Sequence, residues 1–216
     1  MSHRPMKFRY VRGRLGALPR ILDIGCGNGS PSVTKRWFPG CHYSGADIQR
    51  YNLSDADDAA MDEFFQLGAD GSGYDAIPEA SFDFVILNHV VEHMTEPEPV
   101  LFKLCGKLKP GGYIWIAFPS RRSLTLPHSV DETLNFYDDP THVYLPDKRE
   151  IADILLANGV KVLHAGRSRE GFFTSLADVF KLGKRLVKKL FTGKFSGRGM
   201  WYILGFEDHV FGRKAS

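Results

Sequence analysis

The sequence predicts a single three-layer α/β/α domain built on a mostly parallel sheet. Strand-like and helix-like segments alternate along most of the chain, which is typical of helices covering both faces of such a sheet. The nearly continuous apolar run FDFVILN at residues 82–88 suits a strand at the covered centre of a parallel sheet. A glycine-rich turn joins the first predicted strand to the first predicted helix. Because ligands bind beyond the carboxyl ends of parallel strands, we expect the functional residues there.

Local patterns predict each element in turn. Short apolar runs bounded by turn-forming residues indicate strands, and apolar residues at helical spacing indicate helices. Pro31 suits a first helical turn, and Asn158-Gly159 suits a helix end. The predicted strands are residues 20–24, 41–48, 63–69, 82–88, 113–118, 160–165 and 200–206. The predicted helices are residues 30–38, 53–62, 97–108 and 147–157.

Length and composition set broad limits on the class of protein. The 216 residues favour one domain, and 43% hydrophobic with 25% charged residues is ordinary for a globular protein. A net charge of +3 is too small to indicate nucleic acid as the partner over the whole surface. Cys26, Cys41 and Cys105 are far apart and form no C-x-x-C motif, so we expect neither a disulfide framework nor a zinc site. A reducing, cytoplasmic setting fits this pattern. The basic N-terminal segment, residues 1–17, lacks the apolar run of a secretory signal.

The glycine-rich turn, DIGCGNGS at residues 23–30, is the strongest motif. Alternate glycines let the backbone turn sharply and approach a ligand closely. Asp47 stands eighteen residues beyond Gly29, at the end of the second predicted strand, where a carboxylate can accept hydrogen bonds from both hydroxyls of a ribose. Two alternatives stay open: a turn with no ligand, and a dinucleotide-binding dehydrogenase. Ser30 departs from the G-x-G-x-x-G spacing of the latter.

Five sequence blocks together resemble a known family. They are LDIGCGNG at 22–29, GADI at 45–48, ADG at 69–71, SFDFVILNHVVEH at 81–93 and LKPGG at 108–112. With these blocks the chain resembles the class I S-adenosylmethionine-dependent methyltransferases, in the group that includes ubiquinone-biosynthesis and small-molecule methyltransferases. The resemblance covers residues 18–166, which it implies are a cofactor-binding core. It also implies a Rossmann-like, seven-stranded sheet in which the last strand, residues 200–206, is antiparallel.

The resemblance implies S-adenosylmethionine as cofactor and assigns residues to it. Asp47 would bind the ribose and Asp70 the adenine amino group, with Asp75 as a looser match for the same contact. Asp23 would assist the ammonium group through water, and Asn88 would lie near the methyl group. The expected cofactor-binding residues are Asp23, Gly25, Gly27, Gly29, Asp47, Ile48, Asp70, Gly71 and Asn88.

Methyl transfer is a direct displacement, so the protein mainly holds the nucleophile in line with the methyl group. A hydroxyl acceptor also benefits from a base, and His142 and His89 are the catalytic candidates. His93 better fits a local hydrogen bond that fixes its loop. Asp138 and Asp139 beside His142 suggest a metal, but adjacent loop acids are more often caps, and we expect none.

Residues 120–146 have the length of an acceptor-binding lid. Arg121 and Arg122 there would bind an anionic acceptor, or are simply an exposed loop pair. The segment 168–199, before the last predicted strand, is a basic amphipathic insertion. It would contact an anionic membrane or another polyanion, or would pack over the sheet with its lysines in solvent.

We therefore expect methyl transfer to an oxygen atom. The acceptor would be a small molecule, or a lipid-linked, glycolipid or saccharide compound. Three alternatives remain. The first is a cofactor-binding module of a biosynthetic complex that has lost turnover, and the second is the dehydrogenase. The third is an RNA methyltransferase, although Asn88-His89-Val90-Val91 stands where amino-methylating nucleic-acid enzymes often carry Asn-Pro-Pro-Tyr.

Overall fold

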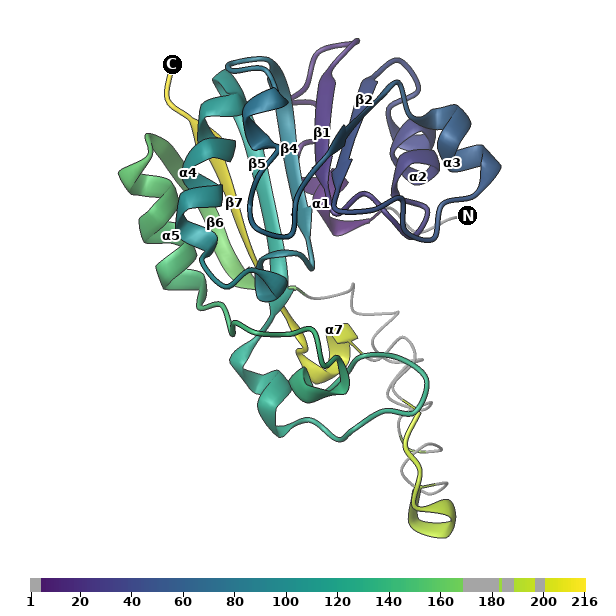
Figure 1. Ribbon diagram of the computed structural model, residues 1–216. Helices are drawn as coiled ribbons and strands as arrows, with labels where there is room; N and C mark the ends of the chain where they lie inside the picture. Colours follow the sequence, from purple (N-terminus) through teal and green to yellow (C-terminus); the bar gives the residue numbers. More distant parts are fainter. Residues whose placement is uncertain (1–4, 169–182, 184–188, 197–200) are drawn as a thin grey trace.

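A computed structural model describes residues 5–168, 183, 189–196 and 201–216 of the chain. Seven strands form one sheet in the order β3-β2-β1-β4-β5-β7-β6, with helices on both faces (Figure 1). The strands are β1 Arg20–Ile24, β2 His42–Asp47, β3 Glu63–Gln66, β4 Phe82–Asn88, β5 Leu108–Pro119, β6 Val160–Arg167 and β7 Glu207–Lys214. The α-helices are α1 Met6–Tyr10, α2 Ser30–Trp37, α3 Asp55–Ala60, α4 Pro97–Lys107, α5 Lys148–Ala157 and α7 Trp201–Leu204.

The strand order reverses beside β1, and this point sets the position of the site. β1 is parallel to both β2 and β4, with Asp23 opposite Gly45 on one side and Ile86 on the other. The chain leaves β1 toward β2 and β3, and later returns to place β4 on the opposite side of β1. Such a switch point opens a crevice at the carboxyl ends of the two central strands. β7 is antiparallel to both of its neighbours, β5 and β6.

Two hydrophobic layers hold the helices against the sheet. On one face Leu22 and Ile24 of β1 pack in a cluster with buried residues of α4 and α5. On the other face Ile21 packs in a cluster with Phe8 of α1 and with Val33 of α2. Successive strand residues point to opposite faces, so Asp23 belongs to the α1 and α2 side.

A buried carboxylate joins α3 to α2 behind the glycine turn. Asp57 accepts hydrogen bonds from the Ser54 backbone in a capping box and from the Ser32 backbone N–H. Burial alone would raise the pKa of Asp57, but the hydrogen bonds from Ser32 and Ser54 lower it to about 2. Asp57 therefore stays ionised and fixes the first turn of both helices.

The predicted α/β/α fold and its seven-stranded, mostly parallel sheet are confirmed, but the last strand was misplaced. Within residues 200–206, predicted as a strand, Trp201–Leu204 form α7, and the last strand is Glu207–Lys214. Trp201 and Leu204 pack beside a small core of Leu126, Leu134, Phe195 and Phe206. This core lies against the lid and not within the sheet. The apolar run at 201–206 therefore packs on lid residues, whereas the prediction made it a strand of the sheet.

The segments predicted to bind the acceptor lie beyond the carboxyl ends of the strands, at the bottom of Figure 1. The predicted lid at residues 120–146 contains two short 3₁₀ helices, η3 Arg121–Thr125 and η4 Phe136–Asp138. Most of the predicted basic insertion at 168–199 falls outside the described residues. In the described part of the chain no helix has the length and apolar character needed to cross a membrane.

Candidate active site

A cavity of about 1150 Å³ opens at the switch point. Its cofactor half is lined by the glycine turn, the end of β2 and the loop after β3. The other half is lined by η2 (Val91–His93) with the residues around it, the lid and the α7 region. We call it the acceptor half because the predicted acceptor-binding lid lines it. Of the predicted cofactor residues, the lining contains Gly25, Gly27, Asp47, Ile48, Asp70, Gly71 and Asn88.

The glycine turn presents bare backbone to the cavity. Gly25 has φ +70°, a conformation that favours glycine. A Cβ on Gly27 would lie 2.6 Å from the Tyr51 carbonyl oxygen, so no side chain fits between the turn and residue 51. Gly29, also at positive φ, is the N-cap of α2 and does not line the cavity. The turn thus provides the close backbone approach that a bound cofactor requires.

Asp47 ends β2 at the cavity wall. Its Oδ1 accepts hydrogen bonds from the backbone N–H groups of Ile48 at 2.7 Å and Gln49 at 3.4 Å. Burial raises the pKa of Asp47, and these two hydrogen bonds lower it in part. Ile48 and Leu67 supply apolar walls on the same side. A carboxylate between apolar walls suits a ribose next to an adenine ring.

Two acids were candidates for the adenine contact, and the structure separates them. Asp70 lines the cavity, where its Oδ1 also accepts a hydrogen bond from the Ser72 N–H at 3.0 Å. Asp75 is 84% exposed, lies outside the lining and pairs with Lys103 at 3.0 Å. Only Asp70 is therefore placed to contact a ligand in this cavity.

Asp23 points away from the cavity. Its side chain is 1% exposed, and its Oδ2 accepts hydrogen bonds from Ser30 Oγ at 2.5 Å and Tyr43 Oη at 2.9 Å. It is absent from the cavity lining. A water-mediated contact with the cofactor stays a prediction, while the direct contacts of Asp23 are with the protein itself.

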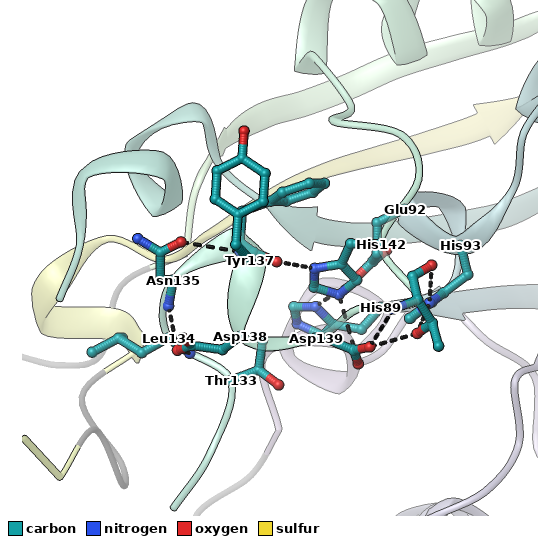
Figure 2. A network of polar contacts seen from close by, with 12 residues as sticks. His89, Glu92, His93, Thr133, Leu134, Asn135, Tyr137, Asp138, Asp139 and His142 are labelled. Atoms are coloured by element: carbon teal, nitrogen blue, oxygen red, sulfur yellow. Dashed lines mark hydrogen bonds and ion pairs between the residues drawn. The ribbon is translucent and has the colours of Figure 1, made fainter. Parts of the chain in front are cut away.

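His89 follows β4 with φ +57° and is held between two buried carboxylates. Its Nδ1 lies 3.1 Å from Glu92 Oε1, and its Nε2 lies 2.8 Å from Glu207 Oε2 (Figure 2 shows Glu92). The ring also packs on Trp201 and Phe206, with centroids 4.7 and 5.8 Å away. Neither ring nitrogen is free to take a proton from a substrate.

Burial alone would lower the pKa of His89, but the hydrogen bonds to Glu207 and Glu92, and their charges, raise it to about 10. In the same way burial would raise the pKa of Glu207, and the hydrogen bond from His89 lowers it. His89 is thus an imidazolium at neutral pH. The predicted role of His89 as a base does not fit this geometry, and its contacts indicate a positioning role.

His142 lies on the lid in a different environment (Figure 2). Its Nδ1 is 2.7 Å from the Phe136 carbonyl oxygen, and its Nε2 is 4.0 Å from Asp139 Oδ2. Asp139 accepts hydrogen bonds from the Thr141 N–H and hydroxyl at 2.9 and 2.5 Å. Burial would raise the pKa of Asp139, but the bonds from Thr141 lower it, so the carboxylate beside His142 is charged.

His93 also joins the lid to the loop after β4. Its Nδ1 lies 2.9 Å from Thr141 Oγ1, which fits the local role that the sequence predicts for it. Glu92, His93 and His142 bring three ligand atoms within 4.8 Å of one another, close enough to hold a metal ion. The expectation that no metal is used stays a prediction.

Sequence reasoning missed Glu92, Glu207 and Trp201. Glu92 stands in the recognised block 81–93, yet only its position between His89 and the lid shows what it contacts. Glu207 is 118 residues from its partner His89, and no local pattern pairs two such distant positions. Arg121, which the sequence offered for an anionic acceptor, pairs instead with Asp147 at 3.0 Å, and neither Arg121 nor Arg122 lines the cavity.

The switch point, the glycine turn and the acid at the end of β2 define a nucleoside-binding α/β domain of the methyltransferase kind. A profile of the methyltransferase domain family matches residues 5–165, and the chain belongs to this family. It is an S-adenosylmethionine-dependent methyltransferase, as the sequence predicts. The bare turn and the Asp47 wall fit that cofactor.

Similar proteins include methyltransferases by name, and a solved structure shares the fold. The chain is 26% identical to a ubiquinone biosynthesis O-methyltransferase of Marinobacter nauticus over 194 residues, 83% of this chain and 79% of the relative. It is 29% identical to the enzyme of that name from Sinorhizobium fredii over 201 residues, with the same coverage. A methyltransferase structure from Archaeoglobus fulgidus superposes with a TM-score of 0.60 at 23% identity, covering 96% of this chain and 91% of that one.

Removal of the Asp47 carboxylate should weaken cofactor binding. We expect Asp47→Ala to raise the dissociation constant of S-adenosylhomocysteine about 10- to 100-fold, because hydrogen bonds to a charged group contribute about 1.5–3 kcal/mol. Asp75→Ala, the matched control outside the cavity, should bind like the wild type. Calorimetric titration measures both, and equal affinities for the wild type and Asp47→Ala would exclude the assigned role.

The charged state of His89 predicts a pH dependence. The pKa of His89 in the folded protein, about 10, lies above the ordinary histidine value of about 6.5. The charge therefore stabilises the fold fully at pH values below the ordinary pKa of about 6.5. This stabilisation should be lost as the pH rises through about 10. Side-chain ¹⁵N NMR, with His89→Gln to assign the signal, should show an imidazolium throughout the neutral range. Titration of that signal at an ordinary histidine pKa would contradict the buried ion pairs.

Proposed function

We propose that the chain methylates a hydroxyl group of a neutral small-molecule acceptor, with His142 as general base. S-adenosylmethionine supplies an electrophilic methyl group when it is bound. The protein holds the acceptor oxygen in line with that methyl group and accepts the proton of the acceptor hydroxyl. The observation that carries the proposal is the hydrogen bond between His142 Nδ1 and the Phe136 carbonyl oxygen.

A carbonyl oxygen only accepts hydrogen bonds, so Nδ1 carries the proton in the neutral ring. The lone pair is then on Nε2, which makes this nitrogen the basic one. Asp139 Oδ2, 4.0 Å from Nε2, is too far for a hydrogen bond that would occupy the nitrogen. It is near enough to stabilise the imidazolium that forms when a proton is taken up.

The acceptor half of the cavity supports a neutral acceptor with an apolar face. Trp201, Phe206 and Met94 line it with aromatic and apolar surface. Its acidic lining residues are Glu92, Glu96 and Asp139. The cations that line the cavity are His89 and Lys103, and Lys103 is paired with Asp75. An anionic acceptor would meet repulsion from these carboxylates. The names of the relatives, ubiquinone biosynthesis O-methyltransferases, support oxygen as the methylated atom.

A lipid-linked acceptor reached at an anionic membrane surface is part of the same proposal. Leu190 and Phe191 are adjacent and each 85% exposed. They belong to the described helical residues 189–192. Lys189 and Lys194 flank them. Exposed apolar side chains between lysines favour contact with an anionic lipid surface.

Replacement of His142 should separate catalysis from cofactor binding. We expect His142→Gln to lower kcat about 10²- to 10⁴-fold, the usual contribution of a general base, while S-adenosylhomocysteine affinity stays unchanged. His128→Gln is the control, because His128 is exposed on the same lid outside the cavity lining. The assay is methyl transfer to a panel of phenols and saccharides, followed by mass spectrometry.

Two results of this assay would contradict the proposal. Full activity in His142→Gln would remove His142 as the base and leave the family assignment intact. A wild-type protein that binds S-adenosylhomocysteine and methylates no acceptor in the panel would favour a cofactor-binding module without turnover.

The membrane contact predicts a loss of vesicle binding in the variant Leu190→Asp/Phe191→Asp. We expect the wild type to sediment with vesicles that contain phosphatidylglycerol at low salt, and the double variant to remain in solution. Phe102→Asp is the matched control, because Phe102 is an exposed phenylalanine on α4. Equal sedimentation of the wild type and the double variant would refute the contact.

A further inference from the structure

The N-terminal helix α1 docks on the sheet face that carries Asp23. Phe8 of α1 is buried and packs edge-on against Phe38, with ring centroids 5.3 Å apart. Val11, just after the helix, is fully buried in the same cluster. These apolar contacts fix the direction of α1, and they leave Lys7 directed at the back of the glycine turn.

Lys7 reaches two residues that flank this turn. Its Nζ lies 3.1 Å from Ser30 Oγ and 3.7 Å from Asp23 Oδ2, and its side chain is only 11% exposed. Ser30 Oγ donates to Asp23 Oδ2 at 2.5 Å, and the Tyr43 hydroxyl donates to the same oxygen at 2.9 Å. Lys7, Ser30, Tyr43 and Asp23 therefore form one polar network, the Lys7 network, below the turn.

Charge makes the lysine essential to this network. The Asp23 carboxylate is 1% exposed, and an ionised carboxylate at that depth is costly unless hydrogen bonds and a cation accompany it. Ser30 and Tyr43 are neutral, so they supply the hydrogen bonds only. Among the described residues Lys7 is the one whose cation forms an ion pair with Asp23.

The network joins the two ends of the glycine turn. Asp23 stands two residues before Gly25, and Ser30 directly follows Gly29 as the first residue of α2. Between them Gly25, Asn28 and Gly29 have positive φ values, and glycines in particular lose much conformational freedom when they are ordered. A turn whose ends are already fixed loses less entropy on binding a ligand.

We propose that Lys7 is a positioning residue for cofactor binding, and that it acts through Asp23 and Ser30 on the glycine turn. The N-terminal segment is then a part of the cofactor site, although it does not line the cavity. The inference also gives Ser30 a function. A glycine at position 30, as the dinucleotide-binding spacing would have it, carries no hydroxyl to join Lys7 to Asp23.

The test is calorimetric titration with S-adenosylhomocysteine of Lys7→Met, which keeps the apolar stem and removes the charge. We expect about tenfold weaker binding, equivalent to about 1.4 kcal/mol, and substantial recovery in Lys7→Arg. Arg12→Ala is the control, because Arg12 is an exposed cation of the same segment and its loss should leave the affinity unchanged. Wild-type affinity in Lys7→Met would overturn the proposal.

A double-mutant cycle shows whether Lys7 acts through Asp23. In an Asp23→Asn background Lys7→Met should cause little further loss of affinity, and an undiminished loss there would overturn the proposal. If Asp23→Asn does not fold, Ser30→Ala takes its place in the cycle with the same expectation. Amide hydrogen exchange at residues 25–29 in the cofactor-free protein should be faster in Lys7→Met than in Arg12→Ala. Equal rates would mean that Lys7 does not order the turn.

Discussion

The acceptor half of this methyltransferase depends on one buried imidazolium. His89 leaves β4 at positive φ and bonds to Glu92 on one side and to Glu207 on the other. The three residues come from three different elements, and each carboxylate would be costly to bury without the shared cation. The Glu92 backbone carbonyl accepts hydrogen bonds from the N–H groups of Val143 and Tyr144. The position of His142, the residue before them, thus depends on the same ion pairs.

The two halves of the cavity are built by different kinds of interaction. The residues of the cofactor half are easier to predict from the sequence than those of the acceptor half. The cofactor half uses residues at the ends of strands or in the turns just beyond them, and local patterns therefore predicted Gly25, Gly27, Asp47 and Asp70 at the cavity. Asp23 shows the limit of such patterns. Its motif assigned it to the cofactor, yet strand alternation turns it to the face opposite Leu22 and Ile24, where Lys7 meets it.

The acceptor half relies on contacts between distant segments, which no local pattern encodes. The polar sequence EDHVFGRK at 207–214 does not resemble a buried strand, whereas the preceding WYILGF does. Three of its polar residues are buried because each has a distant partner: Glu207 bonds to His89, Asp208 pairs with Lys148, and His209 bonds to Ser168. Helix α1 was missed for a related reason, since its five residues are stabilised by the sheet face and not by their own pattern.

His89 and His142 have the same side chain, but their ring nitrogens have different hydrogen-bond partners. Two carboxylates occupy both nitrogens of His89 and favour its charged form. His142 has a carbonyl at Nδ1, which fixes the tautomer without adding a charge, and its nearest carboxylate lies beyond hydrogen-bond distance of Nε2. Nε2 of His89 is occupied by Glu207, whereas Nε2 of His142 has no carboxylate within hydrogen-bond distance, because the partner atoms of the two rings differ. The residue type alone, as read from the sequence, therefore could not separate the two histidines, because the partner atoms at the two ring nitrogens distinguish them.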